Sequence, residues 1–445
     1  MQFFCFFLQI IVYLLYTRAI IMQKTFSYLL SFLLGDETLT QFVGYTADKS
    51  QWQAYKIVIV PSSFFKDHQN GCVKLPALPL SCFNKMPILF GQSASTMVGD
   101  TLVVYADLLA SACFLLSRYE ENLIEERDEH GRFMGKDSLL YKAGYLMRPL
   151  VDEYGSWLRA QLQSMGVGVQ LPNTSLKITL THDVDEPSAH RSLKSLLGGI
   201  MRGETKTAWH NFTHALEQNS YYTFPWIVSQ EAKLPFADKI YFMRMPLQPC
   251  QQDKPYVSYQ SKDMRALVAL LKKNKVQIGL HASYFSGENP QIIGREKIEL
   301  ETAIQQSITT NRYHFLRTCL ADDMSYLADA GIKDDYTLAF ADQVGFRLGT
   351  CRPVAFISPK TLKTSNLILH PLTMMDATLF RYMQLSLDDA FKQACCLIET
   401  VRQYGGELVL LWHNTMLQPQ QPSCLCYQKI LEYLALNVAE QAKKM

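Results

Sequence analysis

The sequence predicts an α/β protein of two domains, and two observations lead to this class. The chain has 445 residues, more than the roughly 250–300 residues at which a single hydrophobic core stops growing. Short apolar runs alternate with amphipathic helical stretches, the order in which crossover helices join parallel strands. The second domain is therefore expected to be a β/α barrel or an open doubly wound sheet.

Composition and charge exclude several kinds of protein. Hydrophobic residues make up 48% of the chain and charged residues 19%, and the formal net charge is +2. Neither disorder nor an electrostatically bound nucleic acid is predicted by these values. The 11 cysteines include no C-x-x-C pair, which favours reduced thiols over disulfides or a zinc knuckle. We expect a cytoplasmic protein.

Residues 1–21 begin with an uncharged apolar run, MQFFCFFLQIIVYLLYT. The run is slightly shorter than the ~20 residues of a membrane-spanning helix, Arg18 ends it, and no cleavage site follows. Three alternatives stay open: sequence upstream of a true start at Met22, an anchor in the inner membrane, or a cleaved signal. Membrane contact is expected only if this segment is a real anchor.

Residues 22–168 are expected to form a small N-terminal α/β domain. Its expected strands are YKIVIV, MPILFG and TLVVYA, and the helix DLLASACFLLSRYEENL follows the last strand. The segment RDEHGRF, with Asp128, His130 and Arg132, is interpreted as an ion cluster at a loop or domain junction rather than as a site. The glycines, proline and small polar residues of GVGVQLPNTS suit a linker, so the domain boundary is placed there.

Residues 169–445 form the second predicted domain, whose apolar runs end in side chains able to do chemistry. These runs are LKITLTHDVD, VQIGLHAS, YHFLR, GFRLGT, LILHPLTMMD and LVLLWHN. The side chains at or near their ends are Asp183, Asp185, His281, His314, Arg347, Asp376 and His413. In a β/α barrel the C-terminal strand ends face one mouth, so we expect these residues to converge there.

The motifs THDVD, IGLHASY and LLWHN resemble those of the polysaccharide deacetylase superfamily, which is related to carbohydrate esterase family four. Together with RDEHGRF, NRYHFLR and GFRLGT they resemble a bacterial subgroup that adds a small N-terminal domain. The resemblance covers residues from about 22 to 420. It implies a deformed β/α barrel that removes acyl groups from sugar amides or esters.

The resemblance also implies roles for individual residues. Asp183 matches the catalytic base, Asp185 a metal ligand and His281 the first metal-binding histidine. His413 matches the histidine that protonates the leaving group, and Arg312 the arginine that orients the base. The chemistry suits these residue types, because amide hydrolysis needs an activated water and a polarised carbonyl. A divalent ion, most plausibly zinc, held by carboxylate and imidazole supplies both.

One position departs from the family's pattern. The second metal-binding histidine usually lies four residues after the first, and Phe285 stands there in this chain. His314 is the first candidate to complete the metal site, and His182 the second. A hydrogen bond from His314 to Asp183 or to a backbone carbonyl is the non-catalytic alternative for His314.

Four more residues are candidate substrate contacts. Arg347 and Asp376 are expected either to bind sugar hydroxyls or to pair with each other, and the sequence does not separate these two roles. Tyr336 and Trp412 are expected to offer apolar surface to a pyranose ring, with core packing as the alternative. His210 and His214 share a helix face, but no nearby carboxylate supports a metal site there.

The predicted function is that of a metal-dependent hydrolase, a deacetylase acting on the C–N bond of an N-acetylated sugar or polysaccharide in surface-polysaccharide metabolism. The alternative is a catalytically silent glycan-binding or polysaccharide-assembly protein on the same barrel. Phe285 favours the alternative, whereas the presence of Asp183, Asp185 and His413 together favours the enzyme. A carbohydrate is the expected partner in both cases.

Overall fold

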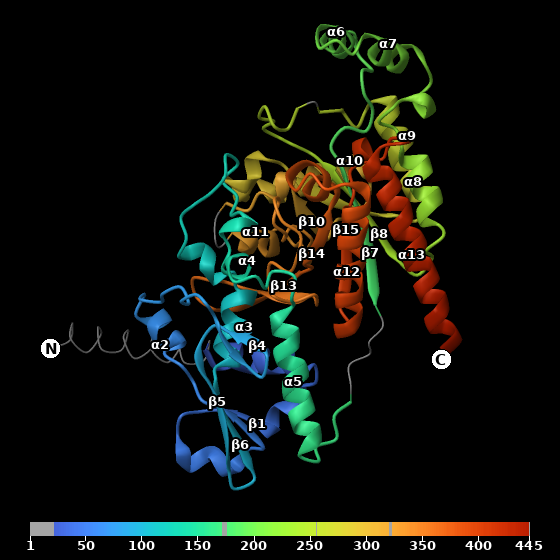
Figure 1. The fold of residues 1–445 in the computed structure, drawn as a ribbon. Coiled ribbons are helices and arrows are strands. Elements are labelled where there is room, and N and C mark those ends of the chain that lie inside the picture. The colour runs from blue at the N-terminus through green and yellow to red at the C-terminus, as the bar shows by residue number, and fades with distance from the viewer. Residues whose placement is uncertain (1–21, 171–175, 255, 320–322, 445) are drawn as a thin grey trace, which may run out of the picture.

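The computed structural model describes residues 22–444 except for 171–175, 255 and 320–322. Within these residues the chain builds two main sheets, one in its first third and one in the remainder (Figure 1). A helix over residues 22–34 precedes the first sheet. The structure therefore belongs to the predicted α/β class.

The first sheet has the strand order β1-β2-β6-β5, in which β1, β2 and β6 are parallel and β5 is antiparallel to β6. Its strands are β1 (Val43–Tyr45), β2 (Ile57–Ile59), β5 (Gly91–Val98) and β6 (Thr101–Ala106). The expected strands YKIVIV and TLVVYA correspond to β2 and β6. The expected strand MPILFG instead forms a separate hairpin of β3 (Ser81–Phe83) with β4 (Met86–Ile88).

The first third also contains α-helices after residue 34. They are α2 (Phe64–Gln69), α3 (Leu108–Leu116), α4 (Leu139–Lys142) and α5 (Leu150–Ser164). Helix α3 begins where the Asp107 side chain accepts a hydrogen bond from the backbone N–H of Ala110 at 3.0 Å, which is a standard N-cap. All residues of α3 are buried, in agreement with its apolar sequence.

The second sheet has the strand order β12-β13-β11-β10-β9-β8-β7-β15-β14, and every neighbouring pair is parallel except β12 with β13. Its strands are β7 (Lys177–Val184), β8 (Asp238–Arg244), β9 (Gln277–Ala282), β10 (Thr310–Tyr313), β11 (Asp334–Asp335), β12 (Val354–Ile357), β13 (Thr364–Leu369), β14 (Leu372–Met375) and β15 (Glu407–Leu411).

Only His370 and Pro371 separate β13 from β14, so the two strands form one bent segment of chain. The first part of this segment pairs with β11 and the second part pairs with β15. Strand β14 at one end of the strand order therefore continues from β13, the second strand at the other end, and the sheet curls back on itself. A curled parallel sheet has all its carboxyl strand ends on one side, which is where polar side chains can meet.

The second part of the chain also contains α-helices. They are α6 (Leu193–Met201), α7 (Thr205–Thr213), α8 (Phe224–Glu231), α9 (Lys262–Lys273), α10 (Ile293–Ile304), α11 (Asp323–Asp329), α12 (Leu387–Tyr404) and α13 (Pro422–Lys444). Helices α6 and α7 form a pair that extends away from the rest of the molecule (Figure 1).

The two parts of the chain contact each other through hydrogen bonds of the first helix. The Thr25 hydroxyl donates to the carbonyl oxygen of Leu362 at 2.7 Å, and the Ala355 backbone N–H donates to the Tyr28 hydroxyl at 2.7 Å. Residues 171–175, within the predicted linker, lie outside the described residues.

The predicted alternative of an inner-membrane anchor is corrected by one finding. Among the described residues, no helix combines the length and the apolar character needed to cross a bilayer. The segment 1–21, on which that prediction was placed, lies outside the described residues.

Candidate metal and active site

Residues at the carboxyl ends of the parallel strands meet in one cluster. The register aligns Arg244 of β8, His281 of β9 and Arg312 of β10 across three neighbouring strands. Each remaining member of the cluster lies within two residues of a strand's carboxyl end, and these members are Asp183, Asp185, His314, Asp376 and His413. Six of the seven residues expected to converge therefore meet in the cluster, whereas Arg347 lies elsewhere.

Asp185, His281 and His314 form a group with the spacing of metal ligands. One ligand atom from each side chain lies within 4.8 Å of the others. The Asp185 Oδ1 atom is 3.4 Å from His281 Nε2 and 3.3 Å from His314 Nε2. Two imidazoles and a carboxylate are a donor set that suits Zn²⁺.

The other nitrogen of each imidazole is held by an acceptor outside the group. His281 Nδ1 lies 2.9 Å from the Arg312 carbonyl oxygen, which can only accept, so Nδ1 carries the proton. His314 Nδ1 lies 3.1 Å from Asp253 Oδ1, and Asp253 also accepts from the Tyr284 backbone N–H. Acceptors of this kind fix the ring orientation of metal-binding histidines and present Nε2 to the ion.

Two polar atoms in this group fit a bound cation. Asp185 Oδ1 and His281 Nε2 are buried and make no hydrogen bond to any described residue. Buried polar atoms are normally paired, and a cation between Asp185 Oδ1 and His281 Nε2 would satisfy both atoms, in addition to the ion-pair contacts of Asp185 with His314 and Arg244. The residues present therefore fit a divalent ion.

His314, and not His182, is the third member of the candidate metal group. Phe285 lies in a short 3₁₀ turn after β9 and supplies no ligand atom. The ring centroids of His314 and His281 are 5.0 Å apart. His182 points to the other face of β7, where Nδ1 contacts the Trp412 carbonyl oxygen at 2.6 Å and Nε2 contacts Glu231 at 2.8 Å. Successive residues of a strand face opposite sides, so His182 cannot share a site with Asp183.

Asp183 lies beside the metal group and is held by Arg312. Arg312 Nη1 donates to Asp183 Oδ1 at 2.8 Å, and Arg312 Nε donates to the Tyr336 carbonyl oxygen at 3.0 Å. Burial favours the neutral carboxyl, but electrostatic interaction with His281, Arg312 and His413 lowers the pKa of Asp183 below its usual value. Asp183 is therefore an ionised carboxylate that can accept a proton.

His413 faces the same group from the end of β15. Its Nδ1 donates to Asp376 Oδ1 at 2.7 Å, and its Nε2 lies 3.8 Å from Asp185 Oδ2. Burial disfavours the charged imidazole, but Asp376, Asp185 and Asp183 together raise the pKa of His413 to about 9. The histidine is thus protonated at neutral pH.

The cluster opens into a cavity of about 520 Å³. Besides Asp183, Asp185, His314 and His413, its lining includes Arg132 from the first third of the chain and the loop residues Phe315 and Leu316. These two loop residues have φ angles of 61° and 54°, a strained left-handed backbone for bulky side chains. Arg132 donates to the Phe315 carbonyl oxygen at 3.0 Å and so supports this turn next to His314.

The segment RDEHGRF is the ion cluster that the sequence predicted. Arg132 pairs with Asp128 at 2.7 Å, and the Asp128 side chain also accepts from the backbone N–H groups of His130 and Arg132. Arg317 donates to the His130 carbonyl oxygen at 2.7 Å, which links the segment to the second part of the chain.

None of the four candidate substrate contacts belongs to the lining of the cavity. Arg347 is buried and pairs with Glu121 at 2.7 Å instead of with Asp376. Tyr336 is buried and stacks on His370, with ring centroids 4.3 Å apart. Trp412 is fully buried and donates from Nε1 to the Ser423 carbonyl oxygen at 3.1 Å. These side chains pack or pair in the interior and do not present a face to a sugar.

The fourth candidate, Asp376, binds His413 through hydrogen bonds and does not face the cavity. It is fully buried and accepts from both the backbone N–H and the Nδ1 of His413. Its carboxylate is occupied by these contacts, so it orients the histidine.

Sequence reasoning missed three residues of the site. Arg244 ends β8, pairs with Asp185 and also donates to the Asp185 carbonyl oxygen, so the strand-end criterion applied to KIYFMRM would have found it. Asp253 lies in a loop after β8, and no local signal marks it as the partner of His314. Arg132 was assigned to a junction, and its place in the lining of the cavity follows only from the tertiary structure.

Comparison with known proteins gives two kinds of likeness. A family model described as a family of unknown function (DUF7033) matches residues 8–166. No curated protein matches the chain. One similar solved structure, described as a polysaccharide deacetylase from Mycobacterium smegmatis, has 14% identity and a TM-score of 0.41, over 62% of this chain and 94% of that one. The crystal structure of Puue allantoinase has 14% identity and a TM-score of 0.35, over 59% of this chain and 86% of that one.

Proposed function

We propose that this protein is a metal-dependent hydrolase that removes acetyl groups from an N-acetylated sugar or polysaccharide. One observation carries the proposal: a metal-type group, an ionised carboxylate and a protonated histidine line a single cavity. Metal-assisted hydrolysis of an amide requires these three functions within reach of one carbonyl. The motif resemblance supplies the substrate class.

Asp185, His281 and His314 would hold the ion, with zinc the first choice for this donor set. A divalent ion bound there polarises an acyl carbonyl and lowers the pKa of a water molecule. Arg244 and Asp253 position the ligands, because they contact Asp185 and His314 from outside the group.

Asp183 is proposed as the general base. It is ionised, and its contact with Arg312 fixes the carboxylate beside the metal group. In this position it can accept the proton of the attacking water. Arg312 is fully buried, so it keeps the geometry of the base without entering the cavity.

His413 is proposed as the general acid. Because Nδ1 is committed to Asp376, the proton available for transfer is on Nε2, which faces the metal group. As the C–N bond breaks, His413 donates this proton to the leaving nitrogen of the sugar. The raised pKa of His413 keeps the proton in place at neutral pH.

A silent glycan-binding protein is the second candidate, and Phe285 at the usual histidine position favours it. The two candidates differ in metal content. Elemental analysis should find about one divalent ion per chain, and Asp185→Ala, His281→Ala and His314→Ala should each lose it. His210→Ala is the matched control, because His210 is exposed and distant in sequence from the group. Absence of metal after incubation with divalent ions would favour the glycan-binding candidate.

A turnover assay distinguishes the proposed base, Asp183, from the proposed metal ligand Asp185. Asp183→Asn should abolish acetate release from N-acetylated sugars while the metal content stays at the wild-type value, because Asp183 is not one of the three proposed ligands. A loss of metal in this variant would mean that the roles of Asp183 and Asp185 are exchanged.

A further inference from the structure

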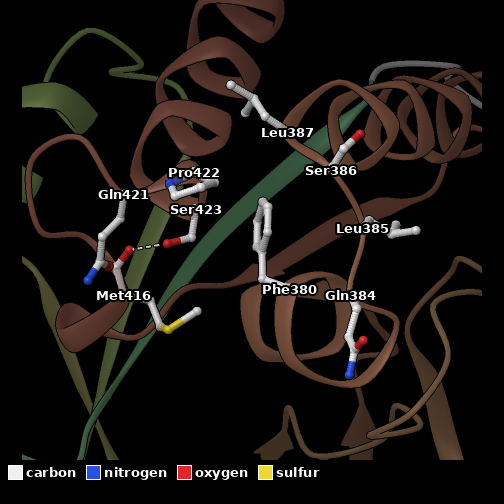
Figure 2. A pocket seen from close by; sticks show the side chains of 9 residues that line it. All are labelled: Phe380, Gln384, Leu385, Ser386, Leu387, Met416, Gln421, Pro422 and Ser423. Carbon is white, nitrogen blue, oxygen red and sulfur yellow. Dashed lines mark hydrogen bonds between the residues drawn. The ribbon is translucent and has the colours of Figure 1, made fainter.

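A second hollow lies next to the catalytic cavity. It has a volume of about 400 Å³ and is formed by the turn after β14, the start of α12 and the loop that leads into α13. Figure 2 shows Phe380 in the middle of this hollow, with Met416 and Gln421 on one side and Gln384 and Leu385 on the other. We call it the side groove.

The side groove adjoins the catalytic cavity. Met416 and Gln421 line both hollows, so the two hollows lie on either side of these residues. Arg381 of the catalytic cavity contacts the Met416 sulfur at 3.3 Å, which positions the thioether at the boundary. A substrate whose reacting group lies near Asp183 would have to pass Met416 to reach the side groove.

The walls of the side groove are mainly apolar. Phe380, Leu385 and Leu387 are half-buried and pack with one side against the core, which leaves the other side toward the groove. Met416 and Pro422 complete the apolar lining.

Two of the polar groups in the groove are already satisfied. The Ser386 hydroxyl donates to Asp389 Oδ2 at 2.6 Å and accepts from the Asp389 backbone N–H, and the Ser423 hydroxyl donates to the Met416 carbonyl oxygen (Figure 2). A sugar ring would need many hydrogen-bond partners, and these serines offer few. The lining therefore suits an apolar group better than a second sugar.

Gln421 marks the change from polar to apolar surface. Its Oε1 atom is buried and has no hydrogen-bond partner among the described residues. An unpaired amide oxygen at the boundary suits a hydroxyl or amide N–H of the sugar, while the groove beyond it suits hydrocarbon.

We infer that the side groove binds an apolar aglycone, an alkyl or aryl group attached to the sugar that is deacetylated. The inference rests on the proposed function and narrows its substrate class to glycoconjugates with a hydrocarbon part. Burial of several methylene groups against Phe380, Leu385 and Leu387 favours such substrates, because each buried methylene adds to affinity.

Matched glycosides test the inference. Acetate release is measured for the methyl and octyl β-glycosides of N-acetylglucosamine and N-acetylgalactosamine, below the micelle concentration of the octyl compounds. The wild-type kcat/KM should be about tenfold higher for the octyl glycoside of the accepted sugar. Phe380→Ser should reduce this ratio toward one and leave the methyl glycoside unchanged. Phe236→Ser is the control, since Phe236 is an exposed phenylalanine that lines neither hollow.

A second variant, Leu387→Asp, tests the inference independently in case Phe380→Ser does not fold. Leu387 is the first residue of α12, where an aspartate interacts favourably with the helix dipole, so Leu387→Asp should fold and should also lower the octyl-to-methyl ratio. Equal kcat/KM values for the two glycosides in the wild type would overturn the inference.

Failure of the proposed function is distinguishable from failure of the inference. If the wild type hydrolyses neither glycoside, the binding of the octyl glycosides is measured by calorimetry to test the groove separately. Binding that Phe380→Ser weakens about tenfold, with Phe236→Ser unchanged, upholds the groove as a site for hydrocarbon while the hydrolase proposal fails. Absent binding, or binding equal in all three proteins, overturns the inference as well.

Discussion

Asp376 gives His413 both its orientation and its charge. The carboxylate is fully buried and accepts from the backbone N–H and from Nδ1 of His413, each at 2.7 Å. Because one carboxylate binds both groups, the imidazole ring is fixed relative to its own backbone. The single Nε2 proton then points toward the metal group.

Asp376→Asn tests this positioning. An asparagine has one acceptor oxygen and cannot accept both hydrogen bonds, so the ring of His413 loses its fixed orientation. We expect kcat to fall at least about tenfold, with KM and metal content unchanged, as measured by acetate release and elemental analysis. Asp388→Asn is the control, since its side chain is 91% exposed on α12. An unchanged kcat would remove Asp376 from this role.

Single positions also show what sequence reasoning can and cannot reach. Asp183, His281 and His413 were predicted because motifs and strand ends mark them, and the structure brings them together. For Trp412 and Tyr336 the sequence left a sugar contact and core packing both open, because adjacent residues at a strand end leave on opposite faces and a strand-end position alone does not say which face is the cavity. A helix or strand pattern also cannot identify a partner from a distant loop.

At the level of elements, the bent segment β13–β14 is tied to its neighbours by His370. His370 Nδ1 lies 2.5 Å from Glu407 Oε2 at the start of β15, and Nε2 lies 3.0 Å from Asp334 Oδ1 in β11. Burial disfavours the charged imidazole, but Asp334 and Glu407 raise the pKa of His370 to about 9. Burial likewise opposes ionisation of Glu407, but contact with His370 lowers its pKa to about 2.

The stability of the fold should therefore depend on pH through this contact. The pKa of His370 is higher in the folded than in the unfolded chain, so its contribution is complete below about pH 6.5 and is lost as the pH rises through about 9. The Glu407 contribution is present above about pH 4.5 and is lost as the pH falls toward 2.

His370→Gln should lose the alkaline part of this dependence. Between pH 6 and 9.5 the free energy of unfolding of the wild type should fall by on the order of 3 kcal/mol more than that of the variant, measured by urea unfolding. His214→Gln, at an exposed histidine, should follow the wild-type curve. Parallel curves for wild type and His370→Gln would contradict the prediction.

Element order was predictable, whereas several strand partners were not. The alternation of apolar runs and helical stretches indicated a parallel sheet, and β7, β9 and β15 are in that sheet. Strand β5 was not predicted, because GQSASTMV is mostly exposed and has no alternation of apolar and polar residues. The closing bend at Pro371 depends on two neighbours far away in the chain, which a local pattern does not contain.

At the scale of the whole molecule, a buried ion pair joins the first third of the chain to the curled sheet. Arg347 Nη2 lies 2.7 Å from Glu121 Oε1, and Arg347 Nη1 donates to the Ala339 carbonyl oxygen at 2.6 Å. Burial opposes ionisation of both groups, but the charge of Arg347 lowers the pKa of Glu121. The pair has a structural role, because neither residue lines the catalytic cavity.

Arg347→Met should destabilise the protein by roughly 3–5 kcal/mol, because Glu121 would be left buried without its main partner. Urea unfolding measures the loss, and kcat of the folded protein should stay near the wild-type value. The double variant Arg347→Met with Glu121→Gln should recover much of the stability, since no buried charge is then unpaired. A loss below about 1 kcal/mol in the single variant would show that Arg118, 3.5 Å from Glu121, suffices as its partner.

The turn at Phe315 has a consequence for protein engineering. Its left-handed backbone follows His314 directly, and the carbonyl oxygen of Phe315 is held by Arg132 of RDEHGRF. A chimera that exchanges the first third of the chain between relatives would replace this support together with the sheet that carries it. The exchanged segment should therefore end before Arg127, so that Arg132, the turn at Phe315 and His314 all come from the same parent.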